Sequence, residues 1–153
     1  MSALKDQLRT DLTTAIKARD ALRSSVIRMV LTAITTAEVA GKEARELTDE
    51  DVITVLGAEA KKRRESAEAF EAGNRPQLAQ KERDEAAILA EYLPEQMSAE
   101  EIQAIVTAAV ESTGSAGVGM KAMGKVMGVV SPQVKGKAEG GVVAAEVKKQ
   151  LGV

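Results

Sequence analysis

Apolar residues recur at helical spacing along most of the chain, and this pattern predicts an all-α fold. In residues 2–19 the apolar positions fall four apart, at Leu4, Leu8, Leu12 and Ile16. This spacing forms one stripe of an amphipathic helix. Residues 20–40 carry a wider apolar face, typical of a helix that contacts neighbours on several sides. β-branched residues never alternate with polar ones over five positions, so no strand is expected.

Capping and turn residues divide the next part of the chain into two more helices. Thr48, followed by three acids, predicts a helix start, because its hydroxyl caps free N–H groups and the acids suit the positive helix end. Residues 73–76, Gly-Asn-Arg-Pro, end that helix. A fourth helix is expected to run to about Tyr92, with Leu78, Leu89 and Tyr92 facing inward.

Pro94 marks the expected boundary between two domains, because proline disfavours helical geometry at the preceding residue. Ser98 to Glu101 then matches a capping box that begins a fifth helix. A sixth helix is expected over about residues 120–130, ending at Ser131-Pro132, and a seventh runs through Leu151. The prediction is a helical N-terminal domain of four helices, residues 1–93, and a three-helix C-terminal domain, residues 94–153.

Composition excludes much chemistry. The 153 residues include no His, no Cys, no Trp, one Phe and one Tyr. Without His and Cys there is no thiol nucleophile, no Ser-His-Asp triad and no imidazole metal ligand. We therefore predict no catalytic residue, metal or cofactor. No apolar run approaches the roughly 20 residues of a membrane helix, and the first residues are charged where a signal peptide is apolar. The expectation is a cytoplasmic protein with no membrane partner.

The net charge of −2 conceals an uneven distribution. Residues 114–153 hold six lysines against two glutamates, a net +4. From Gly119 to Lys137 every charge is positive, at Lys121, Lys125, Lys135 and Lys137. By contrast, the four basic residues 61–64 are expected to form a solvated helix face paired with Glu65 and Glu68. Glu82 and Glu85 are likewise expected to form surface ion pairs.

Two glycine-containing motifs lie in the basic part of the chain. Gly119 to Val126 reads G-x-x-x-x-G-K, but Val126 stands where a P-loop needs a hydroxyl for Mg²⁺, so nucleotide hydrolysis is not expected. Gly124 and Gly128 each cost a helix about 1 kcal/mol relative to alanine. Close approach of another helix, the favoured interpretation, or of a ligand's backbone would compensate. The Lys- and Gly-rich residues 132–141 fit either a phosphate-binding turn or a solvated loop.

Six segments of the chain together resemble the YqeY family. They extend over essentially the whole sequence: Ser25–Met29, Glu59–Ser66, Glu68–Gly73, Glu91–Gln96, Met123–Gly128 and Lys135–Gly140. The resemblance implies an all-helical protein in two parts. It also implies a C-terminal part similar to the tail domain of the B subunit of glutamine-dependent aminoacyl-tRNA amidotransferase, a domain that helps to hold tRNA.

The resemblance turns the basic stretch into a candidate RNA-binding site. It carries RNA contacts over to Lys125, Lys135, Gly136 and Lys137, and the all-positive stretch adds Lys121. The expected function is a non-catalytic tRNA-binding accessory protein. One alternative is an adaptor that docks on a tRNA synthetase or amidotransferase, suggested by the wide apolar face of residues 22–34. Another, implied by kinship alone, is a carbon–nitrogen ligase with glutamine as amido-N-donor. Two departures from the family pattern, Glu139 in place of Asp and the Gly140-Gly141 pair, leave the start of the seventh helix weakly specified.

Overall fold

The computed structural model describes residues 2–153, which form seven α-helices, one 3₁₀ turn and no strand. The predicted all-α class is confirmed. The chain divides into two compact units, one ending at Leu93 and one covering Pro94–Val153. Within residues 2–153 no helix combines the length and the apolar character needed to cross a membrane.

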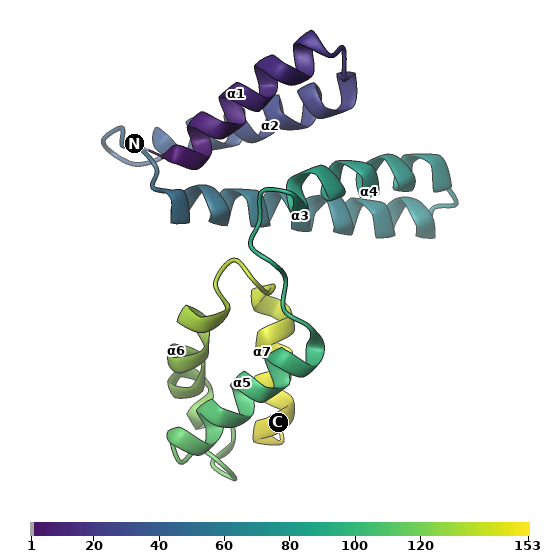
Figure 1. The fold of residues 1–153 in the computed structure, drawn as a ribbon. Helices are drawn as coiled ribbons and strands as arrows, with labels where there is room; N and C mark the ends of the chain where they lie inside the picture. Colours follow the sequence, from purple (N-terminus) through teal and green to yellow (C-terminus); the bar gives the residue numbers. More distant parts are fainter. Residues whose placement is uncertain (1) are drawn as a thin grey trace. The chain divides into compact units, whose positions relative to one another are not determined.

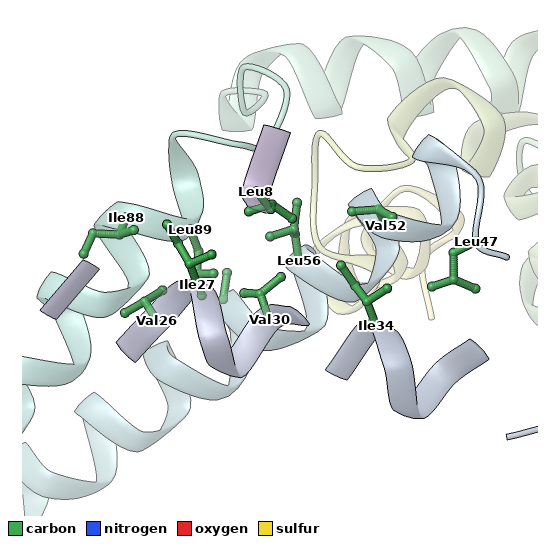
Figure 2. Close-up of a cluster of buried hydrophobic side chains, with 11 residues drawn as sticks. Leu8, Val26, Ile27, Val30, Ile34, Leu47, Val52, Leu56, Ile88 and Leu89 are labelled. Atoms are coloured by element: carbon green, nitrogen blue, oxygen red, sulfur yellow. The ribbon is translucent and has the colours of Figure 1, made fainter. Parts of the chain in front are cut away.

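The first unit contains two helical hairpins (Figure 1). Helix α1 (Ala3–Lys17) lies beside α2 (Ala21–Glu38), and α3 (Asp49–Ala72) lies beside α4 (Pro76–Ala90). Side chains from all four helices meet in one apolar core. Figure 2 shows these side chains, together with Leu47 from the loop that precedes α3. This core contains Leu8, Val26, Ile27, Val30, Ile34, Leu47, Val52, Leu56, Ala60, Ile88 and Leu89.

Side-chain caps mark the starts of α1, α2 and α3, whereas α4 has no side-chain cap and begins with a proline. Thr48 caps α3 as predicted, and the N3 residue Asp51 completes a capping box with it. Two predicted inward positions are wrong, since Ile16 is 48% exposed and Leu78 is 40% exposed. Both residues stand in the terminal turn of their helices beside a hairpin connection. Periodicity gives the orientation of a helix face but not how far the neighbouring helix extends along it.

The second unit packs three helices around a core that contains no aromatic ring. Helices α5 (Ala99–Ser112), α6 (Met123–Val134) and α7 (Gly140–Leu151) contact one another, and the 3₁₀ turn η1 (Gly119–Ala122) leads into α6. Ser98 caps α5 as predicted, because its hydroxyl accepts from the N–H of Glu101 at 3.1 Å. The predicted capping box is only half formed, since the Glu101 carboxylate accepts from the Ser98 hydroxyl and not from its backbone N–H. The buried positions of this core are Ile102, Val106, Ala109, Val110, Ala122, Val126, Val130, Val134, Val143, Val147 and Leu151.

The predicted limits of the sixth helix are wrong at both ends. The α-helix begins at Met123, after η1, and continues through Pro132 to Val134. Proline inside a helix removes one backbone hydrogen bond and crowds the carbonyl of the residue four positions earlier. Here Val134 is buried in the core, one turn beyond the buried Val130. Burial of that valine offsets the lost bond, so the helix continues past the residue that local rules would use as a stop.

Candidate nucleic-acid interface

The basic segment, residues 119–137, contains α6, and its lysines lie near the two ends of that helix. Lys121 stands in η1 and Lys125 in the first turn of α6, whereas Lys135 is the C-terminal cap residue and Lys137 follows it. All four lysines are exposed, and Gly136 is half-buried. Within residues 2–153 no salt bridge forms to Lys121, Lys125 or Lys137. Lys135 stands ten positions after Lys125, about 15 Å along the helix axis, so the lysines lie at the two ends of α6 rather than in one cluster.

Two helical glycines of α6, one next to Lys125 and one in the middle of the helix, face open space. Gly124 and Gly128 are exposed, and a Cβ built at either position meets no atom within 4 Å. The predicted packing of another helix against them is therefore wrong for residues 2–153. Contacts within the described chain leave the stability cost of the two glycines unexplained.

Hydrogen bonds join the turn after α6 to the last residue of that helix. The N–H groups of Lys137 and Ala138 both donate to the Val134 carbonyl, at 2.9 and 3.0 Å. Gly136 has a φ of +77°, a left-handed conformation that side chains disfavour. This explains why a glycine stands between the two lysines.

Residues 94–97 hold the same turn from outside. The side-chain amide of Gln96 donates to the Gly136 carbonyl at 3.0 Å and to the Pro94 carbonyl at 2.8 Å. The N–H of Met97 donates to the Lys137 carbonyl at 2.8 Å. Gln96 was missed by sequence reasoning, because a side-chain bond to a backbone carbonyl 40 residues away leaves no periodic or spacing signal.

The start of α7 adds backbone donors beside this turn. Glu139 is the N-cap residue and makes no side-chain capping bond, as expected for glutamate at this position. The first N–H groups of any α-helix lack helical partners, and they carry the positive end of the helix dipole. At α7 these first residues are Gly140 and Gly141, both exposed. The lysine side chains and the N–H groups at the start of α7 are both electropositive, an arrangement that favours an anionic ligand.

The basic stretch at residues 61–64 is not a simple solvated face. Lys61 pairs with Glu65 at 3.9 Å, as predicted. The guanidinium of Arg63, however, is largely buried, with Nη1 3.1 Å from Glu59 and Nε 3.1 Å from Glu85. Glu85 is only 7% exposed, so its prediction as a surface ion pair is wrong. The α3–α4 packing makes Arg63 an internal tie between the two helices, while Lys61, Lys62 and Arg64 remain exposed.

Within residues 2–153 no group of three or more acidic side chains could hold a metal ion. Tyr92 is the one tyrosine in the chain. Burial, and then the hydrogen bond that its hydroxyl donates to Asp11, hold the pKa of Tyr92 well above its usual value. At neutral pH this hydroxyl therefore keeps its proton and is committed to a structural partner.

These features define a class: an all-helical protein of two compact units, the second of which exposes a lysine-rich segment. The family model described as Yqey-like protein matches residues 5–151, nearly the whole chain. The chain therefore belongs to the YqeY family. A search of curated proteins found no match to this sequence.

Proposed function

We propose that this protein is a non-catalytic tRNA-binding accessory protein whose C-terminal unit contacts the phosphates of folded RNA. The observation that carries the proposal is the charge of residues 112–138. Their only charged side chains are four exposed lysines. Phosphate neutralisation by lysine supplies affinity and register without reading sequence.

The arrangement on α6 supports an extended backbone ligand rather than a single phosphate. A lysine pair stands at each end of the helix, the open Gly124 lies beside Lys125, and the open Gly128 lies between the pairs. A chain of phosphates running along α6 would meet positive charge at both ends and little bulk in the middle. The ordered turn at Gly136 and the N-terminal N–H groups of α7 add donors at one end.

The lack of aromatic residues narrows the kind of RNA. Phe70 and Tyr92 both precede Pro94, so the C-terminal unit has no ring on which a base would stack. Modules that bind single strands rely on such stacking. Recognition through phosphates and shape suits a folded RNA such as tRNA.

The adaptor alternative rested on the apolar face of residues 22–34. Its central members Val26, Ile27, Val30 and Ile34 are buried in the core of the first unit. That face is therefore used inside the chain, and no specific observation favours docking on a synthetase or amidotransferase. The ligase alternative rests on kinship alone.

The proposal is tested by titrating tRNA at several salt concentrations. With about four phosphate contacts, log affinity should fall with log salt at a slope of about −3 to −4. One double variant changes Lys121 and Lys125 to alanine, and another changes Lys135 and Lys137. Each should weaken tRNA binding and reduce the slope of log affinity against log salt by about 1.5.

The matched control changes Lys148 and Lys149 to alanine. These two exposed lysines lie in the last turn of α7, outside the basic segment, and their removal alters the net charge by the same amount. No tRNA binding at low salt would refute the proposal. An equal loss in the control would show that only total charge matters, which would also refute it.

A further inference from the structure

The turn that carries Lys135 and Lys137 has two consecutive peptide planes fixed at both ends. In the first plane, the Gly136 carbonyl accepts from the Gln96 amide while the Lys137 N–H donates to the Val134 carbonyl. In the second, the Lys137 carbonyl accepts from the Met97 N–H while the Ala138 N–H donates to the same Val134 carbonyl. A peptide unit is planar, so fixing both of its ends sets its orientation.

The position of the Lys137 side chain follows from these two planes. The planes flank its Cα, so they determine its φ and ψ and the direction in which its Cβ leaves the backbone. Three of the four fixing bonds are made by backbone N–H groups. The fourth comes from a side chain, that of Gln96, and it is the one that a substitution removes cleanly.

The chemistry of Gln96 suits this role. Its carboxamide nitrogen has two N–H donors, and the structure directs this nitrogen at two carbonyl oxygens, those of Pro94 and Gly136. A glutamate of the same shape would present oxygens to both carbonyls and would lose both bonds. The side chain thereby ties the segment that opens the second unit to the basic turn.

We propose that Gln96 is the positioning residue of the basic turn: it does not contact the RNA but holds Gly136 and Lys137 in the conformation that meets phosphate. This inference rests on the proposed RNA-binding function. It adds that the affinity of the turn depends on residues 94–97, which carry no positive charge.

The first test measures order in the turn of the full-length protein without RNA. In Gln96→Ala and Gln96→Glu, amide hydrogen exchange at Lys137 and Ala138 should become about threefold to tenfold faster, as expected for loss of one ordinary hydrogen bond. The control is Gln133→Ala, because the Gln133 amide donates to Val129 inside α6 and not to the turn. Unchanged exchange in both Gln96 variants would overturn the inference.

The second test is a double-variant comparison of tRNA affinity. Gln96→Ala should weaken binding about threefold to tenfold in the wild-type background. It should have no further effect where Lys135 and Lys137 are already alanine, because the turn then has no charge to position. An equal loss in both backgrounds would indicate general destabilisation and would overturn the inference.

The two tests separate this inference from the proposed function. If the wild-type protein binds no tRNA, the proposed function fails, yet the exchange measurement still decides whether Gln96 orders the turn. If the wild-type protein binds tRNA and Gln96→Ala binds equally well, the positioning role alone is refuted.

Discussion

The substitution Gly128→Ala should change the stability of α6 and the affinity for RNA in opposite directions. It lies in the middle of α6, it is exposed, and an added Cβ meets no atom within 4 Å. Alanine in a helix interior is favoured over glycine by about 0.5–1 kcal/mol. Gly128→Ala should therefore raise the free energy of unfolding by about that amount, measured by hydrogen exchange of the buried α6 amides.

The same substitution should weaken tRNA binding at fixed salt, because the new methyl group stands where the RNA backbone would pass. Gly57→Ala is the matched control. Gly57 lies inside α3 in the first unit, and a Cβ there also meets no atom within 4 Å. The control should gain similar stability, about 0.5–1 kcal/mol, and leave tRNA affinity unchanged. A destabilised Gly128→Ala protein, or one that is stabilised yet binds tRNA normally, would refute this reasoning.

Two further predictions concern the first unit. Arg63→Ala should lower the free energy of unfolding by about 3 kcal/mol, because it leaves the buried Glu85 without its cation. Denaturant unfolding of the two single variants and the double variant with Glu85→Ala measures the coupling. Additive effects of the two substitutions would contradict this prediction. The side-chain hydrogen bond from Lys5 is the main cause that holds the pKa of Glu38 below its usual 4.5. A carboxylate whose pKa is lower in the folded state stabilises the protein at pH values above its unfolded-state pKa. This stabilisation is lost as the pH falls below about 4.5 and through the folded-state pKa. Lys5→Met should therefore show a shallower loss of stability between pH 5 and pH 3 in unfolding titrations, and an unchanged pH dependence would exclude this pairing as the cause.

Helix identity and helix starts were readable from the chain because they depend on neighbouring residues. The four-residue apolar repeat of α1, the Thr48 cap of α3 and the Ser98 cap of α5 all act within one or two turns. Ile16 and Leu78 were misplaced because exposure at a helix end depends on where another helix ends. The helix end expected at Pro132 was wrong for a similar reason, because α6 continues through the proline to the buried Val134.

The candidate site was readable only in part. The lysines were evident as a run of one charge, since charge belongs to residue type. Their division into pairs at the two ends of α6 follows from where that helix begins and ends. The open surroundings of Gly124 and Gly128 depend on which elements do not pack there.

The sequence by itself determined the all-helical class, the helix caps, the absence of His and Cys chemistry, and the location of the positive charge. These follow from residue type and from contacts over a few positions. Only the tertiary structure decided that Arg63 is an internal tie, that the α6 glycines are uncovered, and that the Gln96 amide donates to the Gly136 carbonyl beside Lys137. Each of those outcomes depends on atoms brought together from distant parts of the chain, and no local pattern records them.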